Sequence, residues 1–513
     1  MQKRFEHRPS GSSVFSKSLT VLHVVFVILC YLVAVLSCLF FFTEGKDGIS
    51  IMWKILYIPI ALCFAWIIAE TPKQILYYLT NTGKVHTFYF KLRLIVGVLS
   101  IFALSIIFLI LTAPSTTYQN TFIPNTIAPA GSAQFIDTFA GLTNASVQHG
   151  DAVLPITTGS VFEQLLVQSI GAASSTIDFT TFPWADGTFS TDVFTALTAA
   201  ANRGVQVRLL LDSFGSRSIA RSEIYALQKA GGQVVEYHPF NILEPFAYDD
   251  RSHVRSIVVD GKTAFTGGMG ISGDWFGSTP DKTFEDMMFE VHGAMTASLQ
   301  NSFSELWNEA TGEIISGPEF YASIANTPTD NEFVSITSIP SANYEPVRNA
   351  FMLTALSAQK KLYIVSSYIV PDQALLTILE DKARAGVDVR IVSPGYKTAA
   401  PVLRDAWHAD YAQLLGAGVK IYEYQPTMIH TKFMVVDDVW SLIGSANVDN
   451  RSEALNAENL LGINDPVLAS SLDQSFMTYV SHSTETTQAD WQHQYGFFAH
   501  FYSNMLLLFA KQY

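Results

Sequence analysis

A repeated pattern of helix and strand signals constrains the fold of this 513-residue chain more than any other feature. Gly-Val-Gln-Val-Arg at 204–208 returns as Gly-Val-Asp-Val-Arg at 386–390. Ala-Gly-Gly-Gln-Val-Val-Glu-Tyr at 230–237 likewise returns as Ala-Gly-Val-Lys-Ile-Tyr-Glu-Tyr at 417–424. Each copy is typical of a helix that leads into a strand. Because helices and strands alternate in both halves, the sequence predicts two α/β lobes built on one plan.

Each half then carries the same polar signature: a histidine, a cation two residues later, an aspartate, and a tetrapeptide of small residues. In the second half these are His430, Lys432, Asp437 and Gly-Ser-Ala-Asn at 444–447. In the first half they are His253, Arg255, Asp260 and Gly-Gly-Met-Gly at 267–270. One His-x-Lys arises often by chance, but two copies at equal spacing indicate a functional site. The first copy differs by having Arg for Lys and Gly for Asn.

The paired signature resembles that of the phospholipase D superfamily. Within it, the segments 366–372 and 447–458 are most similar to cardiolipin synthases. The resemblance covers about residues 146–485. It implies an α/β fold with two pseudo-symmetric phospholipase D lobes, mixed sheets flanked by helices, at 146–325 and 326–485.

The residue types of the signature suit exchange at a phosphodiester. Without a metal, this chemistry needs a nucleophile on phosphorus, a proton donor for the departing alkoxide, and cations beside the non-bridging oxygens. His253 and His430 can supply the first two, because an imidazole with a pKa of about 6.5 can be neutral or charged. Arg255 and Lys432 lie two residues from a histidine, which on a strand places each cation on the histidine's face. Both cations are therefore predicted to point at the phosphate.

Other polar residues are predicted to be structural. Asp260 and Asp437 lie an odd number of residues past their histidines, so a continuous strand would point them to the opposite face. The remaining histidines show no metal-ligand spacing, and no metal site is expected. They include His238, His292 and His408.

The resemblance implies further site residues. In the superfamily an acid farther along each half orients that half's histidine through its second ring nitrogen, as in a serine-protease triad. Asp286 and Glu458 stand at the expected spacing, with Glu285 a less suitable alternative to Asp286. Asn447 and Ser445 are expected to bind the phosphate together with Arg255 and Lys432.

The reaction that the resemblance implies begins when His253 attacks phosphatidylglycerol to form a phosphatidyl-histidine while His430 protonates the leaving glycerol. His430 then deprotonates the hydroxyl of a second phosphatidylglycerol, and cardiolipin is released. One phosphodiester replaces another, so no cofactor is expected. If water is the acceptor, the same residues act as a phospholipase D, which requires only that water enter the second step.

The composition is too apolar for an ordinary soluble enzyme, with 49% hydrophobic and 15% charged residues. Residues 1–113 are predicted to form an all-α transmembrane region with three helices of spanning length. These helices cover 19–42, 49–69 and 94–112. A linker rich in Ser, Thr, Asn and Pro is expected over 114–145. An aromatic helix, buried or lying at the membrane interface, is expected over 486–513.

The charge distribution predicts an orientation in a bacterial inner membrane. Before residue 94 lie 10 of the 31 Lys and Arg but only 4 of the 45 acids, and after Arg93 the next cation is Arg203. A flank without cations is expected of a translocated segment. The N-terminus is therefore predicted to be cytoplasmic and the catalytic domain extracytoplasmic or periplasmic. With two crossings instead of three, that domain would return to the cytoplasm.

The formal net charge of -14 disfavours nucleic acid as a partner, because its phosphates are bound mainly by Lys and Arg. The expected partners are a phospholipid substrate, phosphatidylglycerol, and the membrane that holds it. Two alternatives to a cardiolipin synthase stay open: a phospholipase D that produces phosphatidic acid, and a catalytically impaired lipid-binding paralogue. Arg255→Lys with Gly270→Asn would distinguish the paralogue, because an inactive protein that gains turnover supports it.

Overall fold

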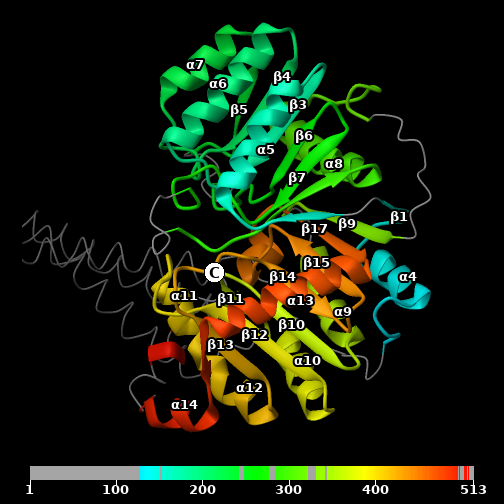
Figure 1. Ribbon diagram of the computed structural model, residues 1–513, viewed down its shortest axis with the longest axis vertical. Coiled ribbons are helices and arrows are strands. Elements are labelled where there is room, and N and C mark those ends of the chain that lie inside the picture. Colours follow the sequence, from blue (N-terminus) through cyan, green and yellow to red (C-terminus); the bar gives the residue numbers. More distant parts are fainter. Residues whose placement is uncertain are drawn as a thin grey trace, which may run out of the picture. The chain divides into compact units, whose positions relative to one another are not determined.

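The computed structural model describes residues 127–150, 153–241, 248–276, 283–321, 331–340 and 344–494, together with 496, 502–504 and 506–507. They form two α/β lobes, the first drawn mainly in green and the second in yellow to orange in Figure 1. The three predicted transmembrane helices lie outside these residues. Among the residues that are described, no helix combines the length and the apolar character needed to cross a membrane.

The first lobe is built on a seven-stranded sheet in the order β2-β8-β7-β6-β3-β4-β5. Its strands are β2 (Leu154–Ile156), β3 (Thr176–Thr181), β4 (Gln206–Asp212), β5 (Gln233–Tyr237), β6 (Ser256–Val259), β7 (Thr263–Gly267) and β8 (Met288–His292). Strands β3, β4 and β5 are parallel, and the others join antiparallel. One face packs on α5 (Gly159–Ala172), α6 (Thr188–Asn202) and α7 (Arg221–Lys229), and the other on α8 (Ala294–Thr311).

The second lobe has a nine-stranded sheet in the order β1-β9-β17-β15-β14-β10-β12-β13-β18. Its strands are β1 (Val147–His149), β9 (Glu332–Ser338), β10 (Lys361–Val365), β12 (Asp388–Pro394), β13 (Lys420–Tyr424), β14 (Phe433–Val436), β15 (Trp440–Gly444), β17 (Glu458–Asn464) and β18 (Ser483–Thr486). Helices α9 (Pro346–Ser357), α10 (Gln373–Arg384) and α12 (Tyr411–Ala417) share the core of one face. Helix α13 (Pro466–Ser481) packs on the other face.

The two sheets confirm the predicted duplication. Six strands follow one order in both lobes, β8-β7-β6-β3-β4-β5 in the first and β17-β15-β14-β10-β12-β13 in the second. The repeated segments form β4 and β12, and then β5 and β13. Gly204 and Gly386 stand just past the ends of α6 and α10 with the same φ of +93°, a left-handed conformation that glycine adopts freely at a helix end.

The boundary of the lobes differs from the prediction. The expected linker over 114–145 contains helix α4 (Ala133–Leu142), which begins at Ser132, where the hydroxyl accepts a hydrogen bond from the Phe135 amide at 3.3 Å. Phe135 and Phe139 pack on Trp440 of the second lobe, with ring centroids 5.0 and 4.9 Å apart. Strand β1, expected in the first lobe, pairs with β9. The apolar face of α4 therefore ties this segment to the second lobe.

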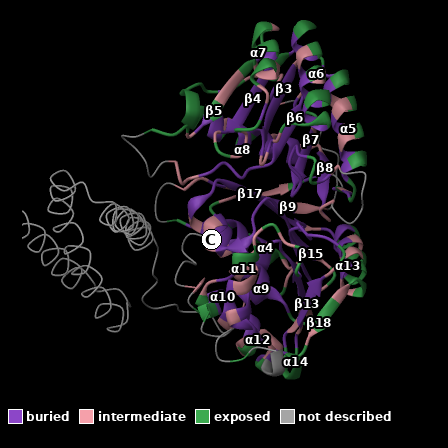
Figure 2. Cartoon of the chain, turned by 90° about the vertical axis from the view of Figure 1, so that its left-hand side faces the viewer, coloured by how far each residue is buried: buried purple, intermediate pink, exposed green. Residues whose placement is uncertain are grey.

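The apolar core continues from one lobe to the other, and buried residues, purple in Figure 2, line the strands of both lobes. One apolar cluster joins Phe289 and Leu299 of the first lobe to Phe333, Phe433 and Leu461 of the second. Because these side chains are almost fully buried, separating the lobes would expose much of the apolar cluster that stabilises them.

The C-terminal part begins differently from the predicted helix over 486–513. Thr486 ends strand β18, which pairs with β13, and the short helix α14 (Gln488–Gln494) follows. Trp491 of α14 is buried and packs against Tyr411 at a centroid distance of 5.0 Å. Most of the aromatic stretch after 494 lies outside the described residues.

Candidate active site at the seam of the two lobes

The two signature histidines are held at the seam by a pair of matching backbone bridges between the lobes. Ser252 pairs with Ala457 and Glu285 pairs with Ile429, both in parallel orientation. The amide of His253 donates to the carbonyl of Ala457 at 2.9 Å, and the amide of His430 donates to the carbonyl of Glu285 at 2.6 Å. In each bridge the residue before a histidine pairs with the residue before an acid of the other lobe.

Each carboxylate therefore contacts the histidine of the opposite lobe. Nδ1 of His253 lies 2.8 and 2.9 Å from the two carboxylate oxygens of Glu458, and Nδ1 of His430 lies 2.7 Å from Oδ2 of Asp286. The expectation that each acid orients the histidine of its own half is thus wrong in the pairing, although it names the same four residues. The physical reason is that each acid directly follows the residue that a bridge joins to the opposite lobe.

Further hydrogen bonds fix both acids. Asp286 accepts from the indole N–H of Trp275 at 2.8 Å, and the hydroxyl of Ser445 donates to Glu458. Ser445 was expected to bind phosphate, but its contact instead positions the Glu458 carboxylate. Glu285 contributes its backbone to the bridge, which leaves Asp286 as the acid on the ring.

The cations of the signature lie with the histidines, fully or almost fully buried. Nζ of Lys432 donates to the hydroxyl of Ser367 and to the carbonyl of His430, both at 2.6 Å, and lies 3.0 Å from Nδ1 of that ring. Nη1 of Arg255 donates to the carbonyl of His253 at 2.7 Å. Among the described residues, Nε and Nη2 of Arg255 have no hydrogen-bond partner. Buried N–H groups of this kind are matched by the oxygens of an anionic ligand.

Asn447 lies beside this centre, and its side-chain oxygen accepts a hydrogen bond from Ser367 at 3.2 Å. Its expected contact with phosphate stays a prediction. Sequence reasoning missed Ser367 and Trp275. Trp275 lies 22 residues past His253, but nothing in the sequence marks its indole as the partner of Asp286.

Burial and the two cations set the protonation of the site residues. Burial lowers the pKa of His253 well below its usual range, and the charges of Arg255 and Lys432 lower it further. Burial and then the charge of Lys432 lower the pKa of His430 to about 3. Burial also lowers the pKa of Lys432 to about 7 and raises that of Glu458 to about 7. Both imidazoles are therefore neutral before an anion binds.

This electrostatic arrangement predicts a bell-shaped pH profile of kcat/KM centred near neutrality. Below the pKa of about 7, Glu458 gains a proton and no longer accepts from His253. Above the pKa of about 7, Lys432 loses its charge and kcat/KM should fall by about tenfold per pH unit. Lys432→Arg, measured over the same pH range, should shift the alkaline limb to higher pH, since Arg keeps its charge. An unmoved alkaline limb would assign that titration to another group.

The first copy of the signature is adapted to its own surroundings. By strand register Phe182 takes the place of Ser367 and Pro183 that of Tyr368. The Phe182 ring lies against the His253 ring, with centroids 5.3 Å apart. A Cβ on Gly270 would lie 2.4 Å from the carbonyl oxygen of Pro183. The glycine that replaces the motif's asparagine is therefore required by the packing around it.

Gly270→Asn is accordingly expected to harm the protein. The overlap with the Pro183 backbone should cost about 1–3 kcal/mol of stability, as overpacking of a core does, and turnover should fall. Gly273→Asn is the matched control, because a Cβ there meets nothing within 4 Å. Thermal unfolding and initial rates of both variants check this. A gain of turnover by Gly270→Asn at unchanged stability would contradict it.

The two signature aspartates are structural, as predicted. Asp437 accepts the amides of Gln359, Lys360 and Lys361 at 2.7 to 2.8 Å, and Asp260 holds residues 174–176 in the same manner. Burial alone would raise the pKa of Asp260. The hydrogen bonds from the backbone of residues 174–176 and from the Ser174 hydroxyl outweigh burial and lower this pKa to about 2. Each aspartate thus fixes the start of a central parallel strand.

Asp437→Asn should lower the free energy of unfolding by about 1–3 kcal/mol, because a carboxylate that serves three amides is lost. Asparagine tolerates the left-handed backbone at this position, where φ is +51°, so the effect reports the carboxylate. The neighbouring Asp438→Asn, whose side chain is 69% exposed, is the control. Urea unfolding of both variants measures the difference, and equal losses would refute this role of Asp437.

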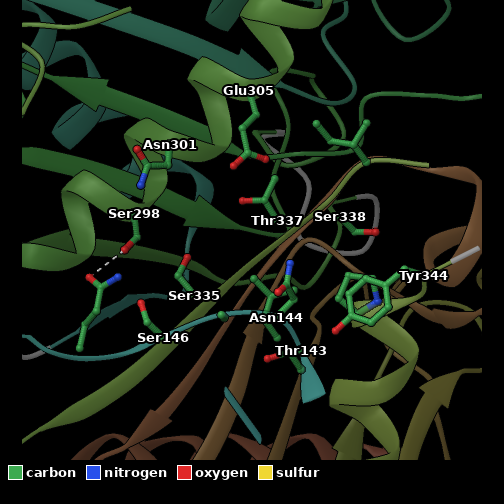
Figure 3. A pocket seen from close by; sticks show the side chains of 15 residues that line it. Thr143, Asn144, Ser146, Ser298, Asn301, Glu305, Ser335, Thr337, Ser338 and Tyr344 are labelled. Atoms are coloured by element: carbon green, nitrogen blue, oxygen red, sulfur yellow. Dashed lines mark hydrogen bonds between the residues drawn. The ribbon is translucent and has the colours of Figure 1, made fainter. Parts of the chain in front are cut away.

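A separate polar pocket of about 450 Å³ lies where α8, β9 and the segment after α4 meet (Figure 3). The described residues that line it include Glu305 and several hydroxyl groups but no Lys, Arg or His. A phosphate anion would find no cation there. Over the described part of the chain, no cluster of three His, Cys, Asp or Glu is placed to hold a metal.

Both lobes match a known protein family. Residues 166–307 and 353–480 match the family model described as the PLD-like domain of cardiolipin synthase, and the two ranges make up more than half of the chain. The chain belongs to this family. The predicted resemblance to the phospholipase D superfamily is thereby confirmed. Both matched ranges contain one histidine of the crossed pairs.

Individual relatives agree with the family. The cardiolipin synthase of Halalkalibacterium halodurans is 35% identical over 266 residues, 50% of this chain and 52% of that protein. Cardiolipin synthase 1 of Bacillus anthracis is 30% identical over 341 residues, 64% of this chain and 66% of that protein. The matches thus span about half to nearly two thirds of these relatives.

A solved structure shares the fold. The phosphatidylserine synthase of Haemophilus influenzae Rd KW20 aligns with a TM-score of 0.57 over 72% of this chain and 97% of that chain. At 15% sequence identity, this similarity establishes a shared fold and nothing about the substrate.

Proposed function

We propose that this chain is a membrane-associated phosphatidyltransferase that joins two phosphatidylglycerol molecules into cardiolipin and glycerol. The observation that carries the proposal is the pair of crossed histidine and carboxylate contacts around two buried cations. Two side-chain nitrogens of one cation, Arg255, have no hydrogen-bond partner within the described part of the chain. The match of the chain to the cardiolipin synthase family supports the choice of phosphatidylglycerol as the substrate. The departures in the first copy of the signature are consistent with activity, because Arg255 still supplies a buried cation.

In the proposed first step, Nε2 of neutral His253 attacks phosphorus while Glu458 holds the proton on Nδ1. Arg255 and Lys432 stabilise the charge that develops on the non-bridging oxygens. Arrival of the phosphodiester anion favours the charged form of His430, which donates its proton to the departing glycerol oxygen. An N–P bond forms, the P–O bond to glycerol breaks, and neutral His430 remains.

In the second step, neutral His430 takes the proton from a hydroxyl of a second phosphatidylglycerol, whose oxygen attacks phosphorus. The N–P bond breaks and His253 returns to its neutral form. Atoms and charges balance without any other reactant. A phospholipase D differs only in that water provides the attacking oxygen.

The experiment that tests this function is product analysis with the purified full chain in mixed micelles that contain phosphatidylglycerol labelled in its acyl chains and, separately, in its glycerol. Cardiolipin and free glycerol in equal amounts are expected. Phosphatidic acid with glycerol would make the chain a phospholipase D. Lipid binding without any product would support the impaired paralogue.

We further propose that the N-terminal region anchors the chain in a bacterial inner membrane with the catalytic domain on the outer side. The support is the run of more than one hundred residues without a cation between Arg93 and Arg203. Fusion after Tyr513 to an enzyme that matures only outside the cytoplasm should give activity. Activity of a cytoplasm-only reporter at the same position would reverse the orientation.

A further inference from the structure

Two exposed aromatic side chains occupy equivalent positions in the two lobes. Phe214 stands two residues after the end of β4, and Tyr396 stands two residues after the end of the matching strand β12. Their exposed fractions are 42% and 77%. A single exposed aromatic residue is ordinary. The same feature at the same place in both halves of a chain calls for a shared explanation.

The turns that carry both rings lie close to the catalytic centre. The turn that carries Phe214 packs on Phe182, because a Cβ on Gly215 would lie 2.4 Å from that ring, and Phe182 contacts the ring of His253. The turn that carries Tyr396 continues to residue 399, whose amide contacts the sulfur of Met428 at 3.1 Å, two residues before His430. Each of the two turns is thus linked through one intervening residue to the segment that carries one of the two histidines.

Cations accompany both rings. The guanidinium of Arg217 lies 4.4 Å from the centroid of the Phe214 ring, and that of Arg404 lies 4.1 Å from the centroid of Tyr396. Arg217 and Lys397 are exposed. Tyr248 adds a third ring beside Phe214, at a centroid distance of 6.5 Å. Aromatic rings next to Arg and Lys are the side chains that favour the level of lipid headgroups, where apolar chains and anionic phosphates meet.

We propose that Phe214 and Tyr396 dock the mouth of the active site on an anionic lipid bilayer. The inference rests on the proposed function, in which the substrate is a phospholipid. While the acyl chains of that lipid stay in the bilayer, the active site can reach its phosphodiester only at the depth of the headgroups. Two contacts, one from each lobe, fix both the height and the tilt of the seam above the membrane. Arg404 is paired with Glu423 and is only 10% exposed, so the exposed cations near the two rings in the sequence, Arg217 and Lys397, are the ones that match the negative charge of phosphatidylglycerol.

The test compares two forms of one substrate. The full chain is reconstituted in phosphatidylglycerol vesicles or supplied in detergent with monomeric short-chain phosphatidylglycerol. Phe214→Ser with Tyr396→Ser should lower the ratio of bilayer turnover to monomer turnover by about 10- to 100-fold, the affinity that burial of such rings provides. Tyr225→Ser is the matched control, because that ring is 67% exposed on α7, in the outer part of the first lobe.

A second measurement reports insertion directly. Phe214→Trp and Tyr396→Trp should each gain fluorescence that brominated lipids quench, relative to the parent chain, whereas Tyr225→Trp should not. An unchanged turnover ratio together with unquenched tryptophans would overturn the docking. Loss of turnover in both substrate forms would instead make the two rings part of the catalytic framework and likewise refute it. If the parent chain converts neither form, the proposed function fails, and quenching still decides the docking.

Discussion

Replacing His253 or His430 with alanine is expected to lower cardiolipin formation by at least about 10³-fold, because each removes a group that acts on the reacting atoms. The initial rate of cardiolipin release from labelled phosphatidylglycerol measures the loss. Both side chains are buried at the seam, so thermal unfolding must show that each variant folds. A residual rate within about tenfold of the parent would exclude a direct role in the chemistry.

The two histidine variants should differ in one respect. With a lipid analogue whose leaving group departs without a proton, such as a p-nitrophenyl phosphodiester, His430→Ala should still give a burst of p-nitrophenol and a lipid-linked protein. His253→Ala should give neither, because the attacking nitrogen is gone. The reverse pattern would exchange the roles of the two histidines while it preserved the proposed reaction.

The second large effect concerns the crossed acids. Glu458→Gln and Asp286→Asn should each lower turnover by about 10²- to 10⁴-fold, as loss of the carboxylate that orients a catalytic histidine does in a serine-protease triad. Because Glu458 contacts His253, its variant should behave like His253→Ala and give no burst. Asp286→Asn should behave like His430→Ala and retain the burst.

The matched comparison of these two acids distinguishes crossed from uncrossed pairing. If each acid served the histidine of its own half, Glu458→Gln would retain the burst and Asp286→Asn would lose it. Gln and Asn preserve the size of the side chains, so the folded seam should survive and the comparison reports the charge and the hydrogen bond.

The sequence predicts the two α/β lobes and places each signature cation with its histidine. Both predictions succeed because they depend on local patterns in the chain. Strands β4 and β12 follow from their apolar runs. Each cation does lie with its histidine, in the segment just before β6 or β14. The structural role of Asp437 was predicted, but the reason was different: β14 ends at Val436, and Asp437 lies in the turn after it with a φ of +51°, where its carboxylate accepts the amides before β10.

Other features depend on distant contacts that no local pattern encodes. The Glu458 carboxylate lies 205 positions from His253, and only the backbone bridge between the lobes assigns it to that ring. The requirement for glycine at 270 comes from the carbonyl of Pro183, far away in the chain. Helix α4 was missed because its ten residues stand among polar neighbours and gain their stability from Trp440.

The crossed bridges also bear on how such a site can change. If one lobe were a separate protein that paired with an identical copy, every substitution would enter both halves of the centre at once. Here the halves are joined in one polypeptide, so Phe182 can stand where the other half has Ser367, and Gly270 where it has Asn447. Because the two lobes belong to one polypeptide, the two halves of the active site need not be identical. In the proposed reaction the two histidines accordingly have different tasks, His253 as the nucleophile and His430 as the acid and then the base for the two alcohols.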